Sequence, residues 1–286
     1  MRKTVIVSIA LLASLGLHGN AEAITEISYN DFSSSSDYTL LGSAQKVGST
    51  LQLVPNTANV VGGVFFSTPV DASSFSASFS FTFSNPGGGD GMVFVIKNPE
   101  SSGSYKKTGL GYTGEAIAYG DRYGVPGIRN SVGVEFDSHK NNTADVTNDI
   151  NDNHIGIDTN ASMLSLAQVP VTLDFNSANP WYAWVDYDGT TLSVSVNQTG
   201  TQPDKPMLSY GTSENPFVIS DYTGSSTALV GFTASTGGAY QTTTLNSFSF
   251  DSTPVPEPST LALLGTGAVF AGIASRRKAR KTSLAG

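Results

Sequence analysis

The chain has 286 residues, of which 39% are hydrophobic, so it is long enough for one large domain with a buried core or for two small ones. It has no cysteine, which excludes disulfide bonds and a lipid anchor on cysteine. Seven basic residues and Glu22 lie in the two terminal segments, so eight basic and 22 acidic residues remain without them. The rest of the chain therefore has a net charge near −14. Such a charge repels nucleic acids and anionic membranes, which argues against both as partners.

The first segment, residues 1–23, has the features of a secretory signal peptide. Two basic residues precede an apolar run from Val5 to Leu17, and residues 21–23 (Ala-Glu-Ala) supply a small-x-small cleavage site. The mature protein is therefore expected to begin near Ile24. The alternative, an N-terminal transmembrane anchor, would need an apolar run of about 20 residues, which is longer than the run present.

Residues 24–252 have the pattern of many short strands. Over residues 74–83 polar and apolar side chains alternate, which is typical of a half-buried antiparallel strand. Seven further strands are expected at residues 91–96, 132–136, 155–157, 181–186, 191–196, 228–234 and 245–250. Residues 187–190, Tyr-Asp-Gly-Thr, predict the turn of a hairpin. Because the sequence has no convincing amphipathic helix, repeat or linker, it predicts one all-β domain built as a two-sheet sandwich or jelly roll.

The last segment, residues 253–286, has three parts. Val-Pro-Glu-Pro-Ser-Thr at 255–260 precedes an apolar run from Leu261 to Ala274, and five basic residues follow. The run is short for a relaxed membrane span and the basic cluster would stay cytoplasmic, so we expect a transient membrane association rather than a permanent tail anchor. This order of parts resembles the PEP-CTERM sorting signal. The resemblance implies cleavage near Pro-Glu-Pro by an exosortase, in a Gram-negative bacterium that makes exopolysaccharide.

The stretch from Val134 to Asp158 concentrates acidic and amide residues between two expected strands. Glu135 and Asp137 are two apart, so both side chains point to the same face of a strand. Burying such a pair costs on the order of several kcal/mol per carboxylate unless a positive charge neutralises it. His154 adds an imidazole, which suits a transition metal, whereas the oxygens suit calcium. The stretch therefore predicts a metal site; the alternative is a solvated acidic loop with a surface histidine.

Val-Glu-Phe-Asp at 134–137, followed by His-Ile-Gly-Ile-Asp at 154–158, resembles the metal-binding signature of the L-type, or legume-type, lectins. Other pieces of the family pattern occur in the same order at residues 29–32, 89–94, 109–112, 231–237 and 246–250. The resemblance covers about residues 25–252. It implies a concanavalin-like jelly-roll sandwich of antiparallel sheets.

The resemblance also implies two adjacent metal ions. The ligands of a transition ion such as Mn²⁺ would be Glu135, Asp137, Asp149 and His154. The ligands of Ca²⁺ would be Asp137, the backbone carbonyl of His139, Asn141 and Asp149. Within the connecting loop, Asp145 is a competing oxygen ligand, and Asp152 is an alternative to Asp149 as the second bridging carboxylate.

In the resembling family the calcium ion positions a sugar. The carbohydrate-binding residues implied here are Asp90, Gly109, His139 and Asn141. Asp90 would accept from sugar hydroxyls, Asn141 and a backbone N–H near Gly109 would donate, and the His139 ring would stack on the sugar. The peptide bond before the Asp90 position is typically cis in the family. Removal of the metal is expected to remove sugar binding.

Three functions fit this sequence. The first is an exported lectin, without enzymatic activity, that binds exopolysaccharide or cell-surface glycans at the Gram-negative envelope, cell surface or extracellular matrix, alone or as a homo-oligomer. The second is a structural matrix or adhesin protein that does not bind sugar. The third is a laminarinase-like glycoside hydrolase, but its catalytic strand needs a second acid, and positions 138 and 139 are serine and histidine.

Overall fold

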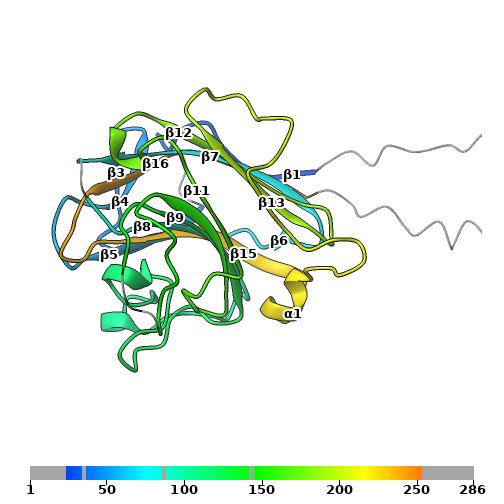
Figure 1. The fold of residues 1–286 in the computed structure, drawn as a ribbon, viewed down its shortest axis with the longest axis horizontal. Coiled ribbons are helices and arrows are strands. Elements are labelled where there is room, and N and C mark those ends of the chain that lie inside the picture. The colour runs from blue at the N-terminus through cyan, green and yellow to red at the C-terminus, as the bar shows by residue number, and fades with distance from the viewer. Residues whose placement is uncertain (1–23, 34–36, 86–87, 142, 144, 253–286) are drawn as a thin grey trace, which may run out of the picture.

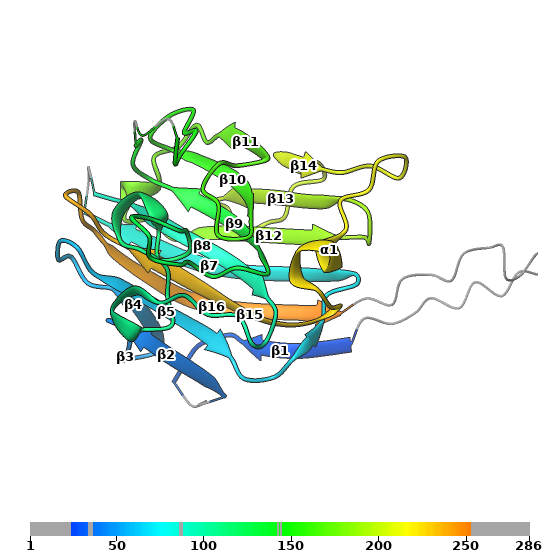
Figure 2. The same ribbon diagram turned by 90° about the horizontal axis from the view of Figure 1, so that it is seen from below.

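The computed structural model of the chain describes residues 24–33, 37–85, 88–141, 143 and 145–252. The expected signal peptide and the sorting segment, including its apolar run, lie outside these residues. Within the described ranges, no helix is long and apolar enough to cross a membrane. Figures 1 and 2 show the described part as two stacked β-sheets.

Sheet 1 contains eight strands. They are β1 (Ile24–Tyr29), β3 (Gln45–Val47), β4 (Thr50–Val54), β7 (Phe75–Ser84), β12 (Trp181–Tyr187), β13 (Leu192–Asn197), β14 (Leu208–Tyr210) and β16 (Thr242–Ser252). Their order is β14-β13-β12-β7-β16-β4-β3, and β1 also pairs with β16. All of these pairings are antiparallel.

Sheet 2 also contains eight strands. They are β2 (Tyr38–Gly42), β5 (Val61–Phe66), β6 (Val70–Asp71), β8 (Gly91–Lys97), β9 (Ser131–Asp137), β10 (His154–Thr159), β11 (Ala167–Pro170) and β15 (Thr227–Ser235). Their order is β11-β10-β9-β8-β15-β5-β2, and β6 also pairs with β15. These pairings are antiparallel as well. The predicted all-β sandwich is confirmed.

The core lies between the two sheets and is rich in phenylalanine. Along β7, Phe75, Phe79 and Phe81 are buried, whereas Ser76 between them is exposed, which is the alternation that the sequence predicts. The Phe79 ring meets the Phe232 ring of sheet 2 edge-on, with 4.9 Å between centroids. Such pairs hold the sheets together through buried apolar area and ring geometry.

Helices are short in the described residues. They are α1 (Ile219–Thr223) and three single turns of 3₁₀ helix: η1 (Tyr105–Lys107), η2 (Gly114–Ala116) and η3 (Phe175–Ser177). In Figure 1, α1 and the beginning of β1 lie at the right, and the green loops between β8 and β9 lie at the lower left. The two ends of the sandwich therefore carry different segments.

All eight predicted strands are present, with ends that differ by at most three residues. The predicted hairpin is confirmed, because β12 and β13 pair and Asp188 Oδ1 accepts hydrogen bonds of 2.8 Å from the N–H groups of Thr190 and Thr191. The strands that the sequence did not predict are β1 to β6, β11 and β14. Several of them lack alternation: β5 is buried along its whole length and β3 is exposed along its whole length, so neither has the period of two.

Candidate metal and sugar site

Strand β9 carries two acidic side chains on the face of sheet 2 that points away from sheet 1. Val132, Val134 and Phe136 belong to the core, so Glu135 and Asp137, which alternate with them, point outward. The two acids thus share one face, as their spacing predicts. Both are nevertheless buried, with 2% of each residue exposed, because loops cover this face.

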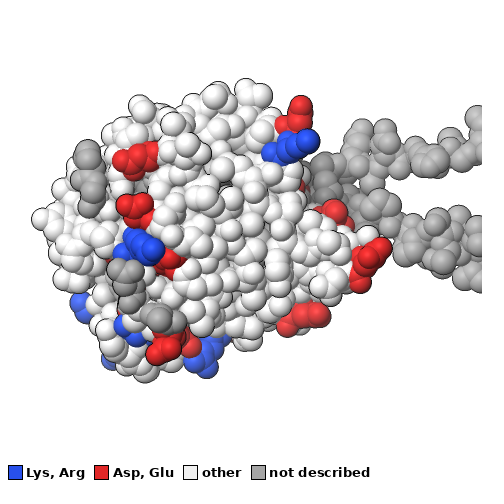
Figure 3. Space-filling model, in the orientation of Figure 1, with Lys and Arg blue, Asp and Glu red and all other residues white. Residues whose placement is uncertain are grey.

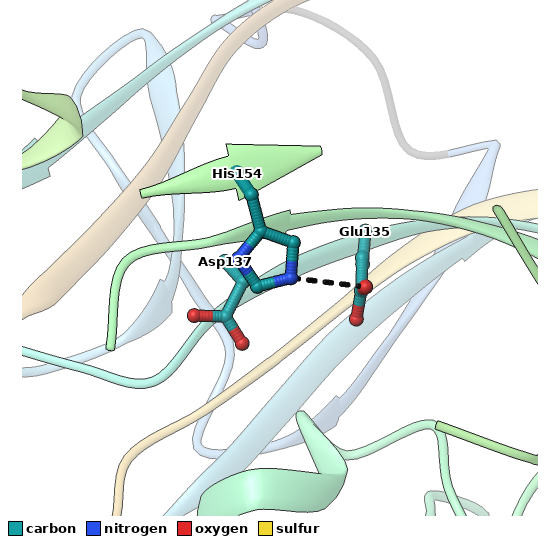
Figure 4. A group of neighbouring side chains, drawn as sticks. All are labelled: Glu135, Asp137 and His154. Atoms are coloured by element: carbon teal, nitrogen blue, oxygen red, sulfur yellow. Dashed lines mark ion pairs between the residues drawn. The ribbon is translucent and has the colours of Figure 1, made fainter. Parts of the chain in front are cut away.

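The register between β9 and β10 adds a histidine to this pair. His154 lies opposite Asp137, and Gly156 lies opposite Glu135. Gly156 leaves room for the carboxylate, because a Cβ there would lie 2.2 Å from Glu135 Oε1. His154 Nε2 is 3.3 Å from that oxygen, and Nδ1 is 3.1 Å from the Asn151 carbonyl oxygen. Figure 4 shows Glu135, Asp137 and His154 converging; one ligand atom of each lies within 4.8 Å of the others, so the group can hold a metal ion.

The electrostatics of this group favour a cation. Burial raises the pKa of Asp137 well above its ordinary value, and the charges of Glu135 and Asp149 raise it further. Burial lowers the pKa of His154. The hydrogen bond to Glu135, the charge of Glu135 and the charge of Asp149 together outweigh burial, so the pKa of His154 is raised overall. Negative groups outnumber the one imidazole, and a divalent cation would neutralise the excess.

The connection from β9 to β10 brings Asp149 to the acidic group. Asp149 Oδ2 accepts a hydrogen bond of 2.7 Å from the backbone N–H of Asn141. Asp149 is half-buried, whereas the alternatives Asp145 and Asp152 are exposed. The Asn141 Oδ1 atom is buried and has no hydrogen-bond partner among the described residues. An amide oxygen of this kind suits Ca²⁺, so the donor set fits the ions that the resemblance implies.

Asp90 lies next to this group, just before β8. The peptide bond between Gly89 and Asp90 is cis, as the resemblance implies. The Asp90 N–H donates to the Ser235 carbonyl (3.0 Å), and the Asp90 carbonyl accepts from the Ser138 N–H (2.9 Å). Burial raises the pKa of Asp90 to about 7, although a hydrogen bond from the Asn141 side chain lowers it. The Asp90 and Asn141 side chains therefore meet.

His139 lies beside the acidic group, whereas Gly109 lies against strand β2. His139 packs against Gly89, where a Cβ would lie 2.8 Å from His139 Cβ, and its N–H donates to Asp137 Oδ1 at 2.7 Å. Gly109 has φ +82° and lies against the Leu41 side chain of β2. His139 is thus beside the acidic group, and the role of Gly109 stays a prediction.

One glycine, Gly237, borders the Asp90 carboxylate, and the sequence did not single it out for this role. The Gly237 backbone forms a hydrogen bond with it that lowers its pKa. A Cβ on Gly237 would lie 3.0 Å from Asp90 Oδ2 and 3.2 Å from Gly114 Cα. Oδ2 is buried and has no hydrogen-bond partner in the described part of the chain. A larger side chain at Gly237 would press against this carboxylate oxygen.

A model of the legume lectin domain matches residues 25–264 of the chain. The chain belongs to the legume lectin family. The PEP-CTERM protein-sorting motif matches residues 254–278 of this lectin. The family and the sorting signal predicted from the sequence are both confirmed.

Curated relatives of this lectin include L-type lectin-domain containing receptor kinases of Arabidopsis thaliana. Kinase VIII.1 is 33% identical over 238 residues, which cover 76% of the lectin and 30% of the kinase. Kinase I.7 is 30% identical over 257 residues, which cover 82% of the lectin and 36% of the kinase. Because the lectin spans about a third of the length of these relatives, their kinase activity is not assigned to it.

Solved structures of legume lectins share its fold. The lectin from Bauhinia forficata in complex with GalNAc has a TM-score of 0.66 and 25% identity, covering 82% of this lectin and 100% of that chain. Peanut lectin with a 9mer peptide has a TM-score of 0.66 and 27% identity, covering 82% and 98%. The metal-free form of lectin I-B4 from Griffonia simplicifolia has a TM-score of 0.65, 23% identity and coverage of 78% and 97%, which shows the fold alone.

Two further side chains of this lectin contact Glu135. Ser165 Oγ donates a hydrogen bond of 2.7 Å to Glu135 Oε1. Asp158 is fully buried, and burial followed by the charge of Glu135 raises its pKa well above the ordinary value. Asp158 continues the alternation of His154 and Gly156 along β10, so the sequence carries a signal for it. Ser165 lies beyond the strand and carries no such signal.

Proposed function

We propose that this chain is an exported, metal-dependent lectin that binds glycans of exopolysaccharide or of cell surfaces. One observation carries the proposal. Asp90 and Asn141 meet beside the buried group of Glu135, Asp137 and His154, and each of the two keeps a buried side-chain oxygen without a hydrogen-bond partner among the described residues. Buried polar atoms are rarely left unpaired, so these oxygens indicate ligands.

Metal ions would satisfy the acidic group. We assign Glu135, Asp137, Asp149 and His154 to a transition ion such as Mn²⁺. We assign Asp137, the His139 carbonyl, Asn141 and Asp149 to Ca²⁺. When bound, the ions supply the positive charge that the crowded carboxylates lack, and they fix the loop that carries His139 and Asn141.

Sugar hydroxyls would meet the polar atoms beside the metals. The Asp90 carboxylate accepts from hydroxyls, the Asn141 amide N–H donates, and the His139 ring lies against the apolar face of the sugar, with a backbone N–H near Gly109 as a further donor. The lectin of Bauhinia forficata, 25% identical, is described in complex with GalNAc, which supports carbohydrate as the ligand class.

The sorting motif supports export and processing by an exosortase. Ser252 Oγ donates to the Asp71 carbonyl, and Asp71 pairs with Thr227 at one end of β15. At the other end, Ser235 accepts the hydrogen bond from Asp90. Eight steps along β15 span about 26 Å. A chain held at the surface through the segment after Ser252 would therefore present the sugar site away from its point of attachment.

The test combines a metal analysis with a glycan array. The purified protein is loaded with calcium and manganese, its metal content is measured, and the array is run before and after chelation. We expect both ions to be present and the glycan signals to disappear with them. Asp90→Ala should remove the signals while the metal content stays unchanged.

Silence on the array with both metals bound would favour the structural matrix or adhesin protein. Glycan signals that survive complete metal removal would refute metal dependence.

A further inference from the structure

The loop between β8 and β9 contains a tight turn that places an aromatic ring in solvent. Arg122 and Val125 pair, with hydrogen bonds of 3.1 and 2.8 Å between their backbones. The two central residues, Tyr123 and Gly124, have φ of +49° and +74°. Such turns favour asparagine, aspartate or glycine at the first central position, because a bulky side chain is strained there. A tyrosine that breaks this local rule indicates a role for the ring itself.

The Tyr123 ring is held in place by its neighbours and is still largely exposed. It is 72% exposed. The Arg122 guanidinium lies over the ring at 4.0 Å from its centroid and donates a hydrogen bond of 3.1 Å to the Tyr123 hydroxyl. The Tyr123 and Tyr112 rings form a T-shaped pair with 5.4 Å between centroids, and Tyr112 and Tyr105 form another with 4.9 Å between centroids. An ordered ring stacks a ligand at little cost in conformational entropy.

A pocket of about 300 Å³ adjoins this ring. Its lining includes Tyr123, Val125, Pro126 and Val146 as well as two arginines. Both arginines are already paired with acids, Arg122 with Glu115 and Arg129 with Asp121. Figure 3 shows acidic and basic side chains close together at the lower left, where the loops between β8 and β9 lie in Figure 1. Because the charges are balanced, the pocket suits a neutral ligand with apolar faces and hydroxyl groups.

Contacts through Glu115 link this pocket to the site at Asp90. Glu115, the partner of Arg122, also accepts a hydrogen bond of 2.5 Å from Thr143 Oγ1, in the loop that carries Asn141. The charge of Glu115 contributes to the raised pKa of Asp90. The neighbouring glycine of the same 3₁₀ turn, residue 114, lies against the glycine that borders the Asp90 carboxylate. Glu115 therefore connects the turn at Tyr123 with the loop that carries Asn141.

We propose that the Arg122–Val125 turn forms a second sugar subsite, in which a neutral pyranose stacks on Tyr123 while its neighbour in the same glycan occupies the site at Asp90 and Asn141. This inference rests on the proposed function. The apolar C–H face of a pyranose suits the exposed surface of the tyrosine ring. The ligand is thus a neutral oligosaccharide rather than a single sugar.

The test compares monosaccharides with oligosaccharides of two to four neutral units that contain them, chosen from the glycan array and titrated calorimetrically. Tyr123→Asn removes the ring but retains a residue that the turn favours, so the fold is not put at risk. It should weaken oligosaccharide binding about tenfold and leave monosaccharide binding unchanged. Tyr123→Trp should restore most of the loss. Tyr182→Ala, on the outer face of sheet 1, is the matched control and should change neither.

Each outcome bears on one of the two proposals. Wild-type protein that binds monosaccharides but gains nothing from added units, or Tyr123→Asn that weakens both ligands equally, would overturn the subsite and leave the lectin intact. A gain restricted to oligosaccharides with uronic acids would contradict the neutral class. Metal-loaded protein that binds no sugar of any length would overturn the proposed function and the subsite together.

Discussion

The two faces of β9 and β10 differ in chemistry although they are equally buried. On the inner face, Val134, Phe136 and Ile155 pack among the rings between the sheets. On the outer face, Glu135 and His154 are just as inaccessible, with 2% and 0% exposed. Burial of the inner face stabilises the fold by removing apolar area from water. Burial of the outer face costs free energy unless a cation compensates, so equal burial has opposite consequences on the two faces.

The largest expected effect comes from breaking the inner face. Phe136→Ala should lower the free energy of unfolding by about 3–5 kcal/mol, because it leaves a cavity among the core rings. The loss should be the same in the presence and absence of metal, because this side chain points away from the acidic group. Urea unfolding with and without calcium and manganese measures both values. A loss that depends strongly on metal would show that the two faces are not independent.

The pH dependence of the metal-free protein is the next largest effect. The pKa of Asp90 is raised from its ordinary value of 3.8 to about 7, so the folded state binds more protons than the unfolded state between these values. The free energy of unfolding should therefore fall by a few kcal/mol as the pH rises from about 4 to about 7. The raised pKa of His154 acts in the same direction, since its contribution is lost as the pH rises through that pKa.

Bound metal should reverse this slope. Protons compete with the cations for the ligands Glu135, Asp137 and Asp149, so the loaded protein should gain stability as the pH rises over this range. Thermal unfolding of metal-stripped and loaded protein across this range compares the two slopes. Parallel curves would mean that the outer face does not hold a cation.

The third expected effect is that of Asp137→Asn on stability, and it changes sign when metal is bound. Asp137→Asn removes one of the crowded carboxylates, so it should stabilise the metal-free protein by about 1 kcal/mol. In the loaded protein it removes a ligand, and the stabilisation that the ions provide should be lost. Melting temperatures of wild type and variant, each with and without ions, form the four measurements. The same sign in both conditions would contradict the ligand role.

The smallest expected effect is the difference between substitutions of Asp149 and Asp152, the two candidates for the second bridging carboxylate. Asp149→Asn should weaken metal binding, because Asp149 is half-buried and its charge acts on Asp137. Asp152→Asn is the matched control, and because Asp152 is exposed it should change stability by less than about 0.5 kcal/mol and leave metal binding unchanged. Calorimetric titration of both variants with Mn²⁺ tests this pair. Equal loss in both would reassign the bridge.

Local patterns in the sequence were sufficient to predict part of the fold and part of the acidic group. The alternation along residues 74–83 predicts β7, and the spacing of Glu135 and Asp137 predicts their shared face, because both are properties of a single strand. The uniformly buried β5 and the exposed β3 have no period to detect. Their places depend on neighbouring strands, which a local pattern does not contain.

In the site, too, some residues could be predicted from the sequence, whereas others are brought together only by the fold. The resemblance to lectins supplied Asp90, His139 and Asn141, which the structure brings beside the acidic group. The contact of Gly237 with Asp90 joins segments almost 150 residues apart and has no local signal. Glu115 and Tyr123 lie in a loop without strand alternation, and only the folded chain brings Glu115 against Arg122, the residue before Tyr123.

The most direct measurement is a calorimetric titration of Ca²⁺ and Mn²⁺ into the metal-stripped protein, with Asp137→Asn titrated alongside. We predict that wild-type protein binds one ion of each kind and that the variant loses most of this binding. Wild-type protein that takes up neither ion, or a variant that binds both as well as the wild type, would contradict the assignment of the outer-face carboxylates to a metal centre.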